Sequence, residues 1–101
     1  MKHVVGVLPV TEKYDLGSQI RRSCKAIPRL ISEGYAKKHQ KAGFQKYLYD
    51  ALGECNELIV SLEQVKDIYN IKAELIKTLV KEYDKSGRQI YNLANKWKSF
   101  S

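Results

Sequence analysis

Apolar residues recur along most of this chain in steps of three and four, the spacing of one face of an α-helix. The longest run predicts a helix over residues 42–69 that packs lengthwise against other helices. Its apolar positions are Phe44, Leu48, Ala51, Cys55, Leu58, Leu62, Val65 and Tyr69.

Two further stretches show the same spacing and predict helices over residues 18–38 and 72–100. The first has Ile20, Cys24, Ile27, Ile31 and Gly34, and the second has Ile76, Leu79, Tyr83, Ser86, Ile90, Leu93, Trp97 and Phe100. Short connections between three amphipathic helices favour an all-α fold, an antiparallel up-down bundle in one domain over residues 1–101. At 101 residues such a domain is close to the size at which oligomerisation supplies missing burial.

Several single residues predict local features of these helices. Ser18 is a candidate N-cap, and Pro28 is expected to bend the first long helix without ending it. Gly34 lies on the apolar face, where it would let another backbone come close. Asn70 is a candidate left-handed residue between the second and third long helices.

Residues 1–17 are the least regular part of the chain, and we expect an irregular segment or the stub of a first helix. The apolar run Val4–Val10 is broken by Gly6 and Pro9, so it is too short for a signal sequence or a membrane span. Cys24 and Cys55 lie on apolar helical positions, which favours buried, reduced thiols. These features predict a cytoplasmic protein that does not associate with a membrane.

The chain is basic, with a net charge of +7 and an isoelectric point near 9.4. The excess is uneven: residues 1–43 carry +6, residues 44–70 carry −3 and residues 71–101 carry +4. A concentrated positive charge favours a polyanionic partner such as nucleic acid.

The candidate nucleic-acid-binding residues form a ridge on the first long helix and a cluster just after it. They are Arg21, Arg22, Lys25, Arg29, Lys37, Lys38, Lys41 and Lys46. Tyr35, His39 and Tyr47 could stack on unpaired bases beside them. Alternatively, Arg21 and Arg22 pair with an acidic ridge of Asp50, Glu54 and Glu57, and the lysines are an ordinary solvated surface. A second ridge, Lys77, Lys81, Lys85 and Arg88, is partly offset by acidic neighbours and is expected to be solvated.

No catalytic or metal-binding constellation is visible in the sequence. Di-iron bundles use Glu-x-x-His pairs, whereas here Glu54-x-x-Glu57 lacks a histidine and His3 and His39 lie outside helix interiors. Gly43 and Gly53 are isolated and form no phosphate loop. We therefore expect a non-enzymatic protein with no cofactor and no metal.

Several short segments resemble the four-helix-bundle family of proteins encoded in intervening sequences of bacterial 23S ribosomal RNA genes. They are Gln19-Ile20-Arg21-Arg22, Ile27-Pro28, Glu33-Gly34-Tyr35, and Ala51-Leu52-Gly53-Glu54 with Glu57-Leu58. The resemblance covers about Leu8 to Leu62. It implies an up-down four-helix bundle that assembles into rings, commonly pentamers. A related branch serves as accessory subunit to the reverse transcriptase of diversity-generating retroelements and binds that enzyme and nucleic acid.

The chain also departs from this family. Only Met1–Val7 precedes Leu8-Pro9, so the first helix is absent or shortened. Ala26-Ile27-Pro28-Arg29-Leu30 stands where the family has Ser-Ile-Pro-x-Asn. The missing helix predicts an apolar groove that a partner element fills, from another copy or another protein.

Two functions follow from the sequence. The first is a basic homo-oligomer that binds the backbone of RNA or DNA. The alternative is a protein-interaction scaffold, for example an accessory subunit of a retroelement reverse transcriptase.

Overall fold

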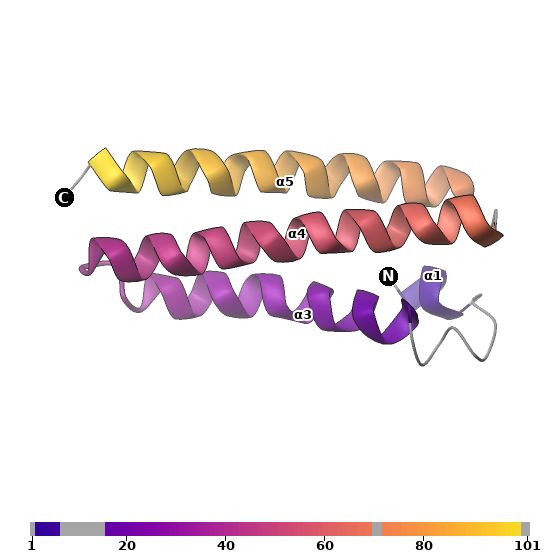
Figure 1. Ribbon diagram of the computed structural model, residues 1–101, viewed down its shortest axis with the longest axis horizontal. Coiled ribbons are helices and arrows are strands. Elements are labelled where there is room, and N and C mark those ends of the chain that lie inside the picture. Colours follow the sequence, from indigo (N-terminus) through magenta and orange to yellow (C-terminus); the bar gives the residue numbers. More distant parts are fainter. Residues whose placement is uncertain (1, 7–15, 70–71, 100–101) are drawn as a thin grey trace.

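The computed structural model describes residues 2–6, 16–69 and 72–99, and within these ranges every regular element is an α-helix (Figure 1). The helices are α1 (Lys2–Gly6), α3 (Leu16–Tyr35), α4 (Lys41–Tyr69) and α5 (Ala73–Ser99). Helix α4 runs antiparallel to both α3 and α5, and the molecule measures 48 × 22 × 15 Å along its principal axes. The prediction of an all-α, up-down bundle is therefore confirmed.

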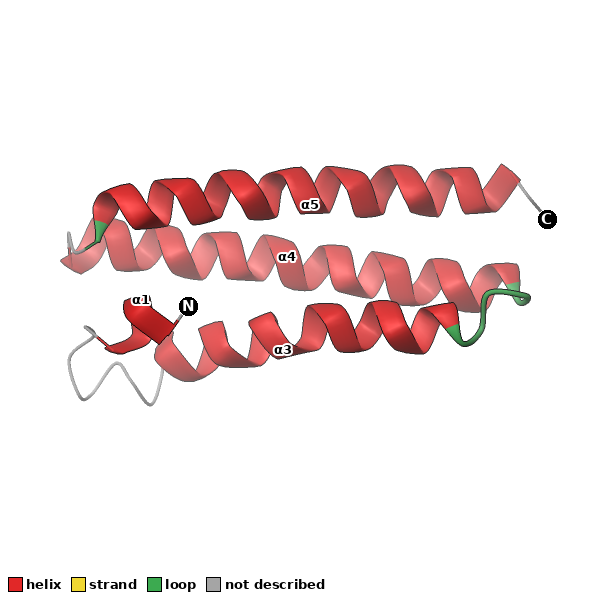
Figure 2. Ribbon diagram, turned by 180° about the vertical axis from the view of Figure 1, so that it is seen from behind, coloured by secondary structure: helices red, strands yellow, loops and turns green. Residues whose placement is uncertain are grey.

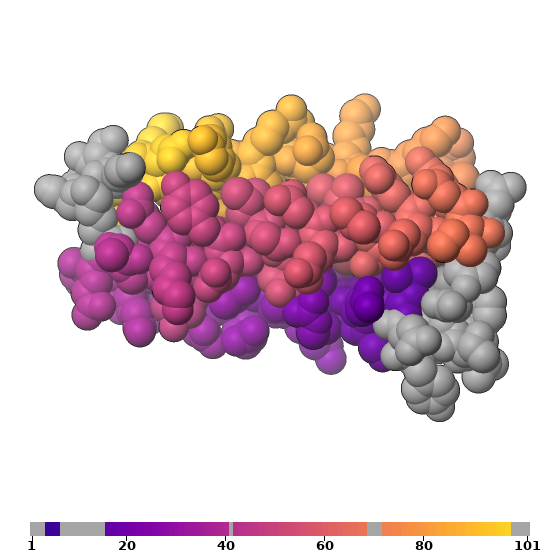
Figure 3. Space-filling model, in the orientation of Figure 1, coloured from indigo at the N-terminus to yellow at the C-terminus, as the bar shows by residue number. Residues whose placement is uncertain are grey.

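Helix α4 is the centre of the bundle. Both α3 and α5 pack along it, and the space-filling view shows α4 between them on one face (Figure 3). Seen from behind, α3 and α5 lie in front of α4, and α1 lies at one end beside the start of α3 (Figure 2). None of the helices in the described ranges is both long enough and apolar enough to cross a membrane.

The ends of α3 differ from those expected. The helix begins at Leu16, two residues before the predicted start, and ends at Tyr35 rather than at residue 38. Ser18 is therefore inside the helix and not its N-cap, and its hydroxyl accepts a hydrogen bond of 3.5 Å from Arg21. Leu16 and Gly17 are buried, so packing explains the earlier start better than capping does.

The remaining local expectations have mixed outcomes. Helix α3 continues through Pro28, whose side chain is exposed, so its ring does not crowd a neighbouring helix. Asn70 lies outside the described residues. Among the described residues, Lys72 has a left-handed backbone, with a φ of 52°, and its carbonyl accepts the hydrogen bond from Ile76 that opens α5.

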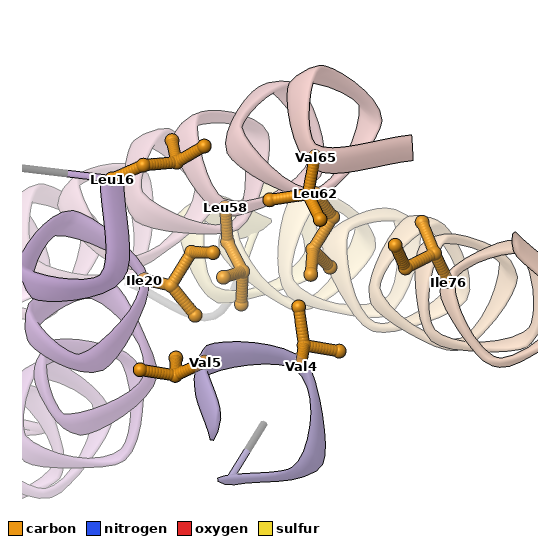
Figure 4. Packing of buried hydrophobic residues seen from close by; sticks show 8 residues of the cluster. All are labelled: Val4, Val5, Leu16, Ile20, Leu58, Leu62, Val65 and Ile76. Carbon is orange, nitrogen blue, oxygen red and sulfur yellow. The ribbon is translucent and has the colours of Figure 1, made fainter. Parts of the chain in front are cut away.

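The predicted stub of a first helix is α1, and it packs into one end of the core. Val4 and Val5 are 0% and 6% exposed. Figure 4 shows Val4 and Val5 below Ile20 and Leu62, in a cluster to which each of the described helices contributes. The members of this first cluster are Val4, Val5, Leu16, Ile20, Leu58, Leu62, Val65 and Ile76.

A second cluster lies at the other end of the bundle and contains no residue of α1. Its buried members are Phe44, Leu48, Ala51, Cys55, Ile90 and Ala94. Leu93, which was predicted to lie on the apolar seam, is 40% exposed, and Ala94 is buried in its place. From Ile90, a step of three residues to Leu93 and a step of four to Ala94 both stay on one face of a helix. The rotation of α5 against α4 buries the residue four positions on.

The two cysteines are free thiols, as predicted. Cys55 is fully buried, whereas Cys24 is half-buried and its Sγ lies 3.9 Å from the hydroxyl oxygen of Tyr83. Burial raises the pKa of both thiols. Burial and the nearby Cys24 thiol raise the pKa of Tyr83 to about 12. Both cysteines therefore stay protonated near neutral pH and act as apolar packing groups.

Candidate nucleic-acid interface

Residues 34–49, which we call the basic corner, contain four lysines, one histidine and no acidic residue. They comprise the end of α3, a tight connection and the first turns of α4. Within the connection, Lys37 donates its N–H to the carbonyl of Gly34, and Lys38 donates to Tyr35, at 2.9 and 3.1 Å. Gln40 accepts the first hydrogen bond of α4, from Phe44. These bonds hold the chain reversal in one conformation.

Gly34 allows the two helices to approach closely at this corner. A Cβ at this position would lie 2.7 Å from Cβ of Tyr47 and 3.1 Å from Cδ1 of Phe44. Real Cβ atoms do not come that close to a neighbour, so any other residue would push α3 away from α4. Gly34 is buried and closely packed, as its place on the apolar face predicted, although the atoms nearest to it belong to the side chains of Tyr47 and Phe44. This contact positions Tyr47 beside the end of α3.

Trp97 of α5 packs against the basic corner and connects it to the third long helix. Its ring packs edge to face against the ring of Phe44, with 4.6 Å between the ring centroids. Its Nε1–H donates a 3.1 Å hydrogen bond to the carbonyl oxygen of Lys38. Figure 1 shows the end of α5 and the connection between α3 and α4 at the same end of the bundle. Trp97, which the sequence places on the apolar face of the third long helix, is thus a packing anchor, and it orients the turn that carries the lysines.

The lysines of the corner lie against tyrosine rings. Nζ of Lys38 lies 4.3 Å from the ring centroid of Tyr35 and 3.1 Å from its hydroxyl oxygen. Nζ of Lys37 and of Lys46 lie 5.4 and 5.8 Å from the ring centroid of Tyr47. Ring faces attract cations, so these contacts hold three ammonium groups beside two aromatic rings. The side chain of Lys41 lies outside the described residues.

The arginines of α3 are in a different environment. Arg22 donates two hydrogen bonds to Glu54, at 2.9 and 3.1 Å, and one of 2.8 Å to Glu57. The hydrogen bonds to Glu54 and Glu57 raise the pKa of Arg22, and the bond to Glu54 has the larger effect. Of the two alternatives that the sequence left open, pairing with the acidic ridge of α4 is the one observed for Arg22.

Arg29 is also paired, although with a residue of its own helix and not with the acidic ridge of α4. Its guanidinium lies 3.4 Å from Glu33, one turn further along α3. The i, i+4 spacing of the two residues is the signal that could have identified the pair. Lys25 is exposed on the same helix.

The positive charge of the corner is not matched locally, because residues 34–49 contain four lysines and no acidic residue. Within the described part of the chain, Lys37, Lys38 and Lys46 form no ion pair with a carboxylate. On α5, by comparison, Lys77 pairs with Glu74 and Arg88 with Asp84. The positive end of the α4 dipole lies at the corner as well and adds to its potential.

A polar surface hollow between α3 and α4 was not foreseen. It is lined by Gln19, Arg22, Ser23, Asn56, Glu57, Val60, Ser61 and Gln64. Its charged groups, Arg22 and Glu57, are already bonded to each other. Among the residues that the structure describes, no group of three or more histidine, cysteine or acidic side chains is placed to hold a metal ion.

Comparison with known proteins gives one result. The family model described as 23S rRNA-intervening sequence protein matches residues 2–92. Searches of curated proteins and of solved structures found no match to the chain.

Proposed function

Because this chain belongs to the 23S rRNA-intervening sequence protein family, we propose that it is a nucleic-acid-binding protein that acts through the basic corner. The observation that supports this proposal most is the absence of any acidic residue from residues 34–49. In addition, the ammonium groups of Lys37, Lys38 and Lys46 have no carboxylate partner among the described residues. The proposed role is binding rather than catalysis, in the cytoplasm.

The contacts at the corner suit phosphate. Lysine ammonium groups that neutralise phosphates release counterions, which stabilises the complex and makes the affinity depend strongly on salt. Arg22 and Arg29 contribute less, because their charges are already matched by Glu54, Glu57 and Glu33.

We expect Lys37→Glu, Lys38→Glu and Lys46→Glu together to lower the affinity for nucleic acid by at least about tenfold, since each change replaces attraction to phosphate by repulsion. The slope of log affinity against log salt should fall by about 2 for single strands, at roughly 0.7 per lost contact. Fluorescence anisotropy with a labelled oligonucleotide at several salt concentrations measures both quantities.

The matched control is Lys77→Glu, Lys81→Glu and Lys85→Glu on α5. This triple variant has the same net charge but leaves the corner intact. It should lose much less affinity and keep the wild-type slope. Equal losses in both variants, or binding that does not respond to salt, would contradict the proposal.

We further propose that several copies assemble, as a ring, through apolar residues that one copy leaves uncovered. Helix α1 covers only the first cluster, and Ile27, Leu30 and Ile31 beside the second cluster are half-buried. Val60 and Ile68, on one face of α4, are 55% and 67% exposed. These are two different surfaces, and a contact between unlike surfaces generates a closed ring when the rotation between copies closes.

Size-exclusion chromatography with light scattering tests this assembly. We expect a mass several times the 11.6 kDa of one chain at micromolar concentration. Val60→Glu with Ile68→Glu should lower that mass, because a carboxylate buried at an interface without a partner destabilises it. A well-folded monomer of the unmodified chain would contradict the proposal. A stoichiometric different protein that stays bound after nuclease treatment would favour an accessory-subunit role.

A further inference from the structure

Tyr35 is an exposed aromatic residue at the edge of a buried aromatic series. Its side chain is 57% exposed, whereas Phe44, which it meets edge to face at 6.3 Å, is 2% exposed. Phe44 in turn packs against Trp97. The ring of Tyr35 is therefore held by the core at one edge while more than half of the residue is in contact with water.

A cation lies over one face of this ring, which leaves the other face for a base. Nζ of Lys38 is 4.3 Å from the ring centroid and 3.1 Å from the hydroxyl oxygen of Tyr35. An aromatic face next to a cation can engage both parts of a nucleotide, since the base stacks on the ring and the phosphate meets the ammonium group.

The same pairing of tyrosine and lysine is repeated next to it. Tyr47 is half-buried, and the ammonium groups of Lys37 and Lys46 both lie near its ring. The close approach of Gly34 to Tyr47 places this second group beside the end of α3 that carries Tyr35. The corner thus presents three cations and an exposed ring on one small surface.

This arrangement fits a single strand better than a duplex. In a duplex the bases are stacked on each other, so a tyrosine ring cannot stack on one without opening the helix. We infer that the basic corner selects single-stranded nucleic acid, with Tyr35 as the surface on which an unpaired base stacks.

This inference rests on the proposed function and adds the class of ligand to it. The test compares a fluorescein-labelled oligouridylate of about 12 nucleotides with a duplex of the same length, by anisotropy at several salt concentrations. The unmodified protein should bind the single strand more tightly. Tyr35→Leu should weaken single-strand binding by about 5- to 100-fold, the range expected for loss of one stacked base.

The salt dependence separates stacking from charge. Tyr35→Leu removes no ammonium group, so its salt slope should equal that of the unmodified protein, unlike that of the lysine variants. Tyr35→Phe and Tyr35→Trp keep an aromatic face and should retain single-strand affinity within about twofold. Tyr91→Leu is the control, because Tyr91 is a comparably exposed tyrosine, at 50%, on α5. It should have no effect.

Heparin provides a second control, since it is a polyanion without bases. Its affinity should be the same for the unmodified protein and for Tyr35→Leu. An equal loss for heparin, equal binding of single strand and duplex, or no effect of Tyr35→Leu on the single strand would overturn the inference. In each case the proposed function would still stand if the lysine variants lost affinity. If binding were independent of salt and of those lysines, the proposed function would fail as well.

Discussion

Leu62→Ala is expected to destabilise the protein more than any other change considered, by about 2–5 kcal/mol in the free energy of unfolding. Leu62 is 0% exposed and lies where α1, α3, α4 and α5 meet (Figure 4). Truncation removes its apolar contacts and leaves a cavity that four separate elements cannot all move to fill. Because domains of this size have a total stability of roughly 5–15 kcal/mol, the loss is a large fraction.

Urea denaturation followed by circular dichroism measures this loss. Leu93→Ala is the matched control, since it is the same change at a position that is 40% exposed on α5. It should cost less than about 1 kcal/mol. Similar midpoints for the two variants would contradict the packing of the first cluster around Leu62.

Gly34→Ala is the second change that we expect to lower the free energy of unfolding substantially. Alanine normally stabilises a helix interior relative to glycine by about 1 kcal/mol. At Gly34, however, the new Cβ would lie 2.7 Å from Cβ of Tyr47, which cannot swing away as the end of a flexible side chain could. Helix α3 would have to move away from α4, and such overpacking costs about 1–3 kcal/mol.

Gly53→Ala is the control for this change. Gly53 lies inside α4, is exposed, and has no atom within 4 Å of the position that a Cβ would occupy. It should gain about 0.5–1 kcal/mol in stability, so the free energies of unfolding of the two variants should differ by roughly 1.5–4 kcal/mol in thermal or urea unfolding. A Gly34→Ala protein as stable as Gly53→Ala would show that α3 and α4 do not approach closely.

Much of the fold could be predicted because a helix repeats its pattern locally. All the predicted seam positions of α4 from Phe44 to Val65 are buried. The side chain of Tyr69 lies outside the described residues. The stub before α3 was also expected, and its two valines occupy the end of the core. Which face of a helix is buried depends on the spacing of apolar residues within one segment, and this spacing can be read directly from the sequence.

The ends of helices and the matching of charges were harder to predict. Ser18 has the side chain of an N-cap, but burial of Leu16 extends the helix past it. In the acidic ridge, Glu54 and Glu57 accept bonds from Arg22, while Arg29 pairs within its own helix. Such choices depend on contacts with other segments, because packing energies exceed the small differences in capping.

The order of residues alone established three amphipathic helices, their antiparallel arrangement and an excess of positive charge. The rotation of each helix about its axis was decided only when the helices packed together. That rotation buries Ala94 in place of Leu93 and joins Arg22 to carboxylates 32 and 35 residues away. It also leaves Lys37, Lys38 and Lys46 without an ion pair to any carboxylate that the structure describes. The physical reason is that periodicity defines a face to within one residue, whereas a distance of a few ångströms between side chains depends on how two separate helices meet.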